Sequence, residues 1–253
     1  MKLLIVSFLW VCFLFSKCLY ANQGIMACSV HYPPFVIEKG DSLTGIIPEV
    51  LTIVFDKKLG IPITFRRWGS WKRCQKAVES GRFDIMMAAV HNDEREIYAV
   101  YTKVPIAEDP QSVFVWKGRE FTFQEWNDLK GKRAGVRLGI SLGKKFDSFL
   151  SENFPLRAHL PSRAQVYKML ELNRIDFTPD GFYPGFITVK ELGYSDKIVA
   201  LKNNIDSEFL FAPMSKKSKH IDSFNKYDEL LEVLKADGVI DKVIEHHEKA
   251  LLE

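Results

Sequence analysis

The sequence alternates between short apolar runs typical of buried strands and longer segments with the apolar spacing of amphipathic helices. In the first half, strands are expected at 24–30, 61–65 and 83–89, and helices at 45–60 and 70–79. Alternation of strands and helices predicts mainly parallel sheets covered by helices. The same alternation recurs in the second half of the chain, which is why we expect an α/β fold with two lobes.

The elements of the second half are set by the same patterns. Strands are expected at 112–116, 133–138, 174–178, 197–201 and 208–213, and helices at 142–152, from Ser162 onward, at 218–236 and at 239–251. No Gly/Ser-rich linker separates the two halves. The lobes are therefore expected to be joined by strands and not by a flexible tether.

The N-terminal segment has the pattern of a signal peptide. Lys2 precedes an apolar stretch at 3–15. Such a stretch is short for a membrane span and suits the apolar region of a secretory signal. We expect residues 1–21 to be a signal peptide that is cleaved after Ala21. An uncleaved anchor and a lipoprotein modified at Cys18 are the alternatives.

Composition excludes some classes of function. The net charge is +3, and cleavage would remove Lys2 and Lys17 and lower it to +1. This charge is too weak to indicate binding to nucleic acid. No pair of Cys or His residues has the spacing of a metal site, and no nucleophile–base pair is evident. We expect no metal, no cofactor and no catalytic residue.

Two cysteines remain after cleavage, Cys28 and Cys74. Cys28 lies in the first expected strand, and Cys74 lies on a helix that should pack on the same sheet. An exported protein can meet an oxidising environment, where disulfides persist. A disulfide between the two cysteines is one hypothesis, and two separate buried thiols is the other.

The loops after the strands are the expected place for a ligand. In open α/β sheets, ligands bind beyond the carboxyl ends of the strands. That rule selects five segments of the chain, at 31–35, 66–71, 89–95, 137–142 and 178–183.

Segments along nearly the whole mature chain resemble the bacterial extracellular solute-binding proteins of family 3. These segments occur in the family's order, and they read "YPPFVIEKGDSLTGIIPEVL", "WKRCQKAVESGRFDIMMAA", "LKGKRAGVRLGISLG", "LNRIDFTPD" and "LKADGVIDKVIEHHEKA". Each motif alone is weakly specific, and five in the right order are fairly strong. The resemblance implies two lobes joined by two crossover strands, with one ligand between them.

The same resemblance implies boundaries, location and partners. Lobe 1 would comprise 22–108 plus 207–253, and lobe 2 would comprise 109–206. The protein would be a periplasmic monomer. It would capture a small polar solute, such as an amino acid or a related carboxylate or amine, and deliver it to an ABC-type membrane transporter by closing its lobes on the ligand.

In lobe 1 the resemblance points to Arg95 and His91. An Arg near this position clamps a ligand carboxylate in the family, and a guanidinium can meet a carboxylate with two parallel hydrogen bonds. His91 occupies the place of a hydroxyl residue that bonds the ligand. The alternatives are a surface ion pair for Arg95 and a water-facing loop position for His91.

Aromatic residues and a second group of polar residues complete the expected site. Tyr32 and Trp71 resemble the aromatic walls of the ligand pocket, with core packing as their alternative. In lobe 2, Arg137 ends a strand, Ser141 begins a helix, and Asp180 falls where the family often pairs an acid with the ligand ammonium. We expect all five residues to contact the ligand.

Two other functions fit the same resemblance. A few proteins of this fold are periplasmic dehydratases of the cyclohexadienyl type, which need a general acid at the leaving hydroxyl. Only Asp180, Glu94 and His91 are candidates for that role. The other alternative is a ligand-sensing module that passes its state to a membrane signalling partner.

Overall fold

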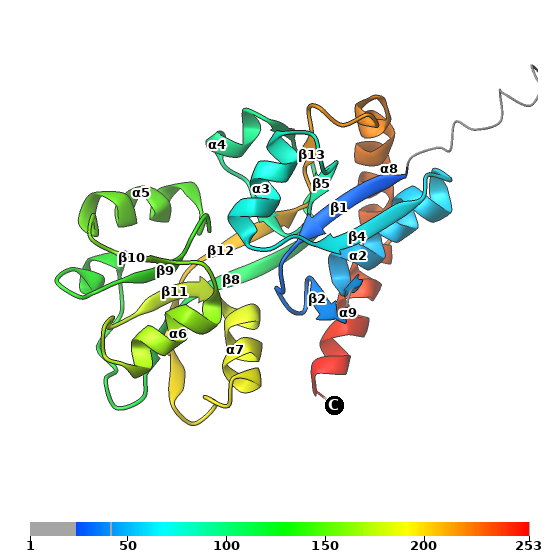
Figure 1. The fold of residues 1–253 in the computed structure, drawn as a ribbon. Helices are drawn as coiled ribbons and strands as arrows, with labels where there is room; N and C mark the ends of the chain where they lie inside the picture. The colour runs from blue at the N-terminus through cyan, green and yellow to red at the C-terminus, as the bar shows by residue number, and fades with distance from the viewer. Residues whose placement is uncertain (1–23, 41, 253) are drawn as a thin grey trace, which may run out of the picture.

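The computed structural model describes residues 24–40 and 42–252, and the predicted signal peptide at 1–21 lies outside them. The described chain has two lobes (Figure 1). We call lobe 1 the part built on the five-stranded sheet, and lobe 2 the part that contains residues 116–197. Two long strands run from one lobe to the other.

Lobe 1 is built on a five-stranded sheet. The sheet order is β4 (Ile63–Arg67), β1 (Ile25–Ser29), β5 (Ile85–Met86), β13 (Met214–Ser215) and β7 (Ala99–Val100). Strand β1 is parallel to both of its neighbours, whereas β13 is antiparallel to β5 and β7. A small hairpin, β2 (Ile37–Lys39) with β3 (Ser42–Thr44), follows β1.

A four-stranded antiparallel sheet joins the lobes. Its order is β11 (Thr178–Gly181), β8 (Ala107–Trp116), β12 (Ile198–Phe211) and β6 (Ala89–Val90). A separate parallel pair in lobe 2 comprises β9 (Gly135–Arg137) and β10 (Ala158–Leu160). Parallel pairing, as expected from the alternation, thus occurs within each lobe, while the strands that connect the lobes pair antiparallel.

Helices cover these sheets. In lobe 1 they are α2 (Ile46–Leu51), which continues as the π-helix η1 (Thr52–Lys58), α3 (Trp71–Glu79), α4 (Asp93–Glu96), the short 3-10 helix η3 (Ile221–Ser223), α8 (Phe224–Ala236) and α9 (Val239–Leu252). In lobe 2 they are η2 (Trp126–Leu129), α5 (Lys144–Asn153), α6 (Arg163–Glu171) and α7 (Phe182–Glu191). Ser70 and Ser162 cap α3 and α6 with their side-chain oxygens, as expected for these residues.

Each lobe has its own apolar core, and each of the two long strands contributes residues to both cores. On β8, Ala107 belongs to the core of lobe 1 and Val113 to that of lobe 2. On β12, Ile205 belongs to lobe 2 and Leu210 to lobe 1. The chain passes between the lobes in these two short stretches, so a small change of backbone angles there can move one lobe against the other.

A disulfide joins Cys28 on β1 to Cys74 on α3, with the two Cα atoms 5.8 Å apart. Both residues are fully buried within a satellite core of lobe 1, where the helix packs on the sheet. The bond thus ties α3, which carries Trp71 at its first position, to the strand that leads to Tyr32.

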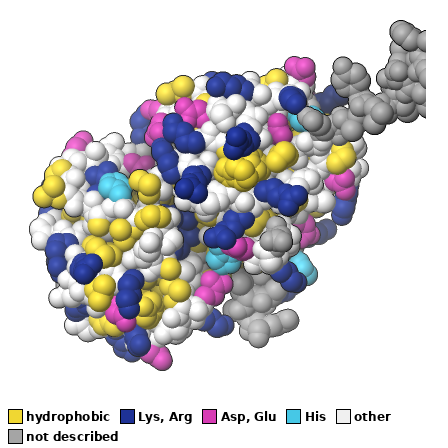
Figure 2. Space-filling model, in the orientation of Figure 1, with side chains coloured by type: hydrophobic (Ala, Val, Ile, Leu, Met, Phe, Trp, Pro, Cys, Tyr) yellow, Lys and Arg dark blue, Asp and Glu magenta, His cyan; other side chains and the backbone are white. Residues whose placement is uncertain are grey.

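The surface of the described residues is mixed in charge. Figure 2 shows Lys and Arg side chains interspersed with Asp and Glu over one face of the molecule. Within residues 24–252, none of the helices combines the length and the apolar character that a membrane crossing needs.

Candidate functional site

The aromatic residues expected at the ligand both lie between the lobes. Tyr32 follows β1 and is buried, and its hydroxyl donates a 2.8 Å hydrogen bond to Oδ2 of Asp109. Two guanidinium groups of lobe 2 lie close to the Tyr32 ring, that of Arg163 4.4 Å and that of Arg137 5.4 Å from its centroid. Trp71 is buried at the start of α3, and Arg95 stacks over its ring at 5.5 Å. The rings serve as flat platforms for cations of the protein.

Arg95 is buried at the junction of the lobes. The short helix α4 holds it in place, because the Asn92 side chain accepts a hydrogen bond from the Arg95 amide and caps the helix. The residue is 3% exposed. It donates to the Val90 carbonyl at 2.5 Å and to the Gly139 carbonyl of lobe 2 at 3.1 Å. No carboxylate forms an ion pair with Arg95 among the described residues, although Asp147 lies near enough to interact with it electrostatically.

Arg137 is the second buried guanidinium of the cleft. It ends β9 and is 9% exposed. Its Nε has no hydrogen-bond partner, and no described carboxylate forms an ion pair with it. Burial, reinforced by the neighbouring Arg163, lowers the pKa of Arg137 to about 10. The residue is still protonated at neutral pH, and an unpaired buried cation of this kind is costly unless a ligand supplies the missing anion.

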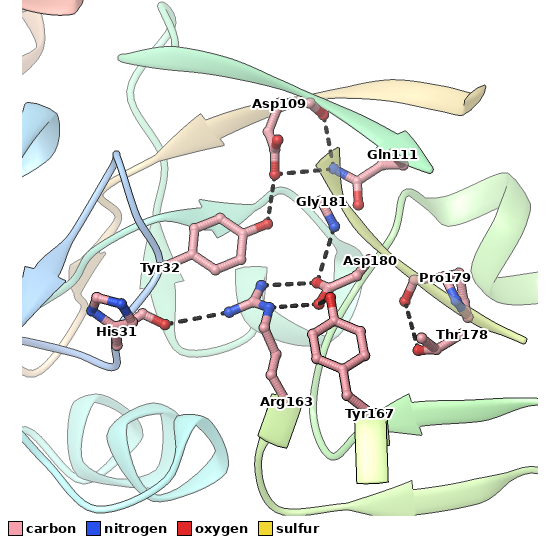
Figure 3. Close-up of polar contacts among 10 residues, drawn as sticks. All are labelled: His31, Tyr32, Asp109, Gln111, Arg163, Tyr167, Thr178, Pro179, Asp180 and Gly181. Atoms are coloured by element: carbon pink, nitrogen blue, oxygen red, sulfur yellow. Dashed lines mark hydrogen bonds and ion pairs between the residues drawn. The ribbon is translucent and has the colours of Figure 1, made fainter. Parts of the chain in front are cut away.

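Asp180 lies at the cleft but is already paired. Figure 3 shows the Arg163 guanidinium facing both of its carboxylate oxygens. The Nε–Oδ2 distance is 2.5 Å and the Nη2–Oδ1 distance is 2.8 Å. The Tyr167 hydroxyl and the Gly181 amide also donate to the same carboxylate. Burial alone would lower the pKa of Arg163, but Asp180 outweighs it and the net shift is upward.

Ser141 also lies at the cleft, in the loop before α5. Its hydroxyl donates to Oδ2 of Asp147 at 2.6 Å, and the Leu142 amide donates to the other oxygen at 2.9 Å. The hydroxyl hydrogen is thus committed to Asp147, and the Ser141 oxygen is left to act as an acceptor.

Two neighbouring cavities border these residues, with the exception of Asp180. A narrow one of about 10 Å³, room for one water molecule, lies among Tyr32, Trp71, Arg95, Arg137 and Ser141. A second cavity of about 180 Å³ shares Arg95 and Arg137 with the first. Its other charged or titratable lining residues are Lys72, Glu94, Asp147, Arg157 and His159. The lobes are thus closed on a small polar cleft in which guanidinium groups predominate.

His91 lies away from this cluster. Its side chain contacts Oε1 of Glu96 at 2.7 Å and packs against the rings of Tyr101 and Phe211. The preceding residue, Val90, borders the narrow cavity. Successive residues of an extended segment point to opposite sides, so His91 faces away from the cleft. Of the seven expected ligand contacts, five line the narrow cavity. Asp180 is buried beside it, paired with Arg163, but lines neither cavity, and His91 lies outside.

Two buried charged residues beside the cleft, Arg163 and Asp109, were not among those expected from the sequence. Arg163 is the first residue of α6, and the capping pattern at Ser162 places it on a helix without indicating its partner. Asp109 is fully buried in β8, and one of its oxygens has no hydrogen-bond partner. The Asp109–Pro110 dipeptide carries no pattern that would predict a buried acid. The partners of both residues, Asp180 for Arg163 and Tyr32 for Asp109, lie in distant segments of the chain.

Burial raises the pKa of Asp109 from 3.8 to about 7, although the hydrogen bond from Tyr32 opposes the shift. Between these two values the folded state holds a proton that the unfolded state has lost. The contribution of Asp109 to the free energy of unfolding therefore falls by up to about 1.4 kcal/mol per pH unit as the pH rises from about 4 to about 7, and is constant above.

The matched variant Asp109→Asn removes this titration. Urea unfolding at pH 5, 6, 7 and 8 is expected to show the variant gaining stability relative to the wild type as the pH rises to about 7. A difference that stays constant over this range would show that Asp109 is ionised in the folded protein throughout.

Comparison with known proteins assigns the chain to a family. The sequence matches the family of bacterial extracellular solute-binding proteins, family 3, over residues 25–249. No curated protein sequence matches the chain.

Solved structures of low sequence identity share the fold. A histidine kinase sensor domain with similarity to periplasmic binding proteins is 16% identical, with a TM-score of 0.76 over 88% of this chain and 95% of that one. The arginine-, lysine-, histidine-binding protein ArtJ from Geobacillus stearothermophilus is 19% identical, with a TM-score of 0.72 over 88% and 94%. The amino acid ABC transporter substrate-binding protein AbpA from Streptococcus pneumoniae, bound to L-arginine, is 20% identical, with a TM-score of 0.73 over 91% and 96%.

Proposed function

The chain belongs to the bacterial extracellular solute-binding proteins, family 3, and from that premise we propose that it captures a small carboxylate-bearing solute in the cleft between its lobes and delivers it to an ABC-type membrane transporter. The family name implies export from the cytoplasm, which agrees with the expected signal peptide and a periplasmic location. Tyr32, Trp71, Arg95, Arg137 and Ser141 are the proposed ligand contacts.

The observation that carries this proposal is the pair of buried guanidinium groups. Arg95 and Arg137 border the same two cavities, and neither has a carboxylate partner among the described residues. A guanidinium meets a carboxylate with two parallel charge-assisted hydrogen bonds, each stronger than one to a neutral carbonyl. A ligand carboxylate would therefore supply the anion that the closed cleft lacks.

The same contacts suggest how the ligand could control closure. Arg95 belongs to lobe 1 and Arg137 to lobe 2, so a solute bound to both bridges the lobes. Such a solute contacts both residues only when the lobes are together, and this differential affinity favours the closed state. The Gly139 carbonyl of lobe 2 accepts hydrogen bonds from Arg95 and Gln75 of lobe 1. These two bonds connect the lobes in the absence of a ligand.

A transporter is the proposed partner because one of the three similar structures is described as part of an ABC transporter system. AbpA is described as an amino acid ABC transporter substrate-binding protein. At these sequence identities the similarity shows the fold alone. The fold is shared with the histidine kinase sensor domain as well, so it does not distinguish a transporter from a signalling partner. A pull-down from membranes with and without ligand distinguishes them, since recovery of a kinase in place of a permease would contradict delivery to a transporter.

The dehydratase alternative gains no support from the cleft. Its three candidate acids are already engaged: Asp180 by Arg163, Glu94 by Lys72, and His91 by Glu96. Incubation with prephenate or arogenate tests the alternative, and formation of the aromatic product would establish an enzyme.

The experiment that tests the proposed function is a thermal-shift screen of amino acids, polyamines and small organic acids. A ligand at a hundred times its dissociation constant is expected to add about 2.7 kcal/mol to the free energy of unfolding. Arg95→Ala should weaken binding of that ligand by about 10- to 100-fold, because it removes a charge-assisted hydrogen-bond donor.

Arg66→Ala is the matched control, since it removes an exposed guanidinium from β4 of the same lobe. The affinity of Arg66→Ala for that ligand should equal the affinity of the wild type. Unchanged affinity in Arg95→Ala would show that Arg95 does not contact the ligand.

A further inference from the structure

We propose that the solute is a compact dianion that carries no ammonium group. This inference rests on the proposed function, because it names the class of solute that the cleft accepts. It depends on the two unpaired guanidinium groups of the cleft and on the ion pair that occupies Asp180.

The positive charge of the cleft calls for two anionic groups. Arg95 and Arg137 come from different lobes and are both buried, and the Nε of Arg137 lacks any hydrogen-bond partner. One carboxylate could satisfy one guanidinium with two parallel bonds. The other guanidinium would then remain buried without an anion, which is costly. A second anionic group on the solute removes that cost.

The carboxylate expected to bind an ammonium is already neutralised. Arg163 occupies both oxygens of Asp180, and the two side chains are each 6% exposed. Arg163 is itself held in this position, since its Nη1 donates to the His31 carbonyl at 3.3 Å and its guanidinium stacks on the Tyr32 ring (Figure 3). A solute ammonium would have to displace a bidentate, buried guanidinium to reach Asp180.

The other described carboxylates near the cleft also have donors. Asp147 accepts from Ser141 and from the Leu142 amide. Glu94 is exposed and lies 3.2 Å from the Lys72 ammonium. Asp109 accepts from Tyr32 and does not line either cavity. Glu94 is paired with a cation, whereas Asp147 is held by neutral donors only. An ammonium in the cleft would have to compete with the donors that already bind these two carboxylates.

The size and the remaining charges of the larger cavity fit a small anion. Its volume is about 180 Å³, below the usual range for drug-sized ligands. Lys72 and Arg157 add two positive charges to those of Arg95 and Arg137, and the lining also holds two carboxylates, Glu94 and Asp147, so positive charge predominates. The electrostatic field of the cleft therefore attracts anions and disfavours a solute with a net positive charge.

Matched pairs of compounds test the proposal by titration calorimetry. Succinate and L-aspartate differ only in the amino group, as do glutarate and L-glutamate, while propionate has a single carboxylate. Each dicarboxylate is expected to bind at least 10-fold more tightly than its amino counterpart and than propionate. Glycerol phosphate and inorganic phosphate form a second arm, and tighter binding there would support the dianion but overturn the carboxylate named in the proposed function.

The variant Arg137→Gln tests the second anionic contact. It should weaken dicarboxylate binding by about 10- to 100-fold while leaving propionate affinity within a few fold. Removal of an unpaired buried charge should not lower stability, so a folded variant is expected. Arg133→Gln, which removes an exposed guanidinium paired with Asp176, is the control and should bind as the wild type does.

The outcomes separate the inference from the proposed function. L-aspartate, L-arginine or another amino acid could bind more tightly than the dicarboxylates and lose that binding in Arg95→Ala. This result would overturn the dianion and leave the proposed function standing. Absence of binding by every anion and every amino acid of the wider screen would overturn both. Equal losses for dicarboxylate and propionate in Arg137→Gln would contradict the second anionic contact.

Discussion

Replacing Arg163 with methionine is expected to lower the free energy of unfolding by about 3–5 kcal/mol. The substitution keeps an unbranched side chain of similar length but removes the only cation that pairs with Asp180 among the described residues. Asp180 is 4% exposed, so water cannot replace the lost guanidinium. The uncompensated buried carboxylate accounts for the size of the effect.

Urea unfolding measures this loss, with two comparisons. Arg133→Met breaks a surface ion pair with Asp176 and should change stability by no more than about 1 kcal/mol. The double variant Arg163→Met/Asp180→Asn removes both charges of this pair and should recover more than half of the loss. A loss in Arg163→Met no larger than that in Arg133→Met would mean that the Asp180 carboxylate does not need Arg163 in the folded protein.

Removing the disulfide is expected to cost about 4 kcal/mol of stability. Cys28 and Cys74 close a loop with a sequence separation of 46 residues, and the loss of chain entropy in the unfolded state scales with the logarithm of that length. The bond also holds α3 on β1, which positions Trp71 and Tyr32 at the cleft. The double variant Cys28→Ser/Cys74→Ser should therefore unfold at a much lower urea concentration.

Dithiothreitol provides the matched control for this prediction. Reduced wild-type protein should unfold near the urea midpoint of the double serine variant, and the variant itself should not respond to the reductant. A wild-type midpoint that is the same with and without reductant would show that the cysteines are not bonded, or that their bond contributes nothing to stability.

The alternation of strand and helix was sufficient to predict the α/β fold with two lobes, and the family match agrees with it. The pattern did not predict that 197–201 and 208–213 belong to one long strand, β12. Polar residues interrupt the apolar alternation at 202–204, between Leu201 and Ile205 of the lobe 2 core, where the register of β12 with β8 shifts. Local periodicity loses its signal where a strand is irregular.

Much of the cleft could be predicted because strand ends are local features. The rule that ligands bind beyond the carboxyl ends of strands places Tyr32, Arg95 and Arg137 correctly between the lobes. It could not predict that Arg163 would occupy Asp180, since that ion pair depends on the packing of α6 against β11. Partners are set by tertiary contacts, and single-sequence patterns report little about them.

His91 illustrates the same limit on a smaller scale. The sequence places it directly after the strand β6 and close to Arg95. Which side of the chain it faces depends on the orientation of that strand, which is fixed by pairing with β12. The structure turns Val90 toward the cleft and His91 toward Tyr101. A ligand contact by His91 stays a prediction that would require this segment to move.

The measurement that tests the central claim most directly is a crystal structure with the tightest-binding compound of the screen. We expect an anionic group of that compound within hydrogen-bonding distance of the Arg95 guanidinium and a second one at Arg137, with Arg163 still paired to Asp180. A ligand bound elsewhere, or one whose ammonium lies on Asp180 in place of Arg163, would contradict the account.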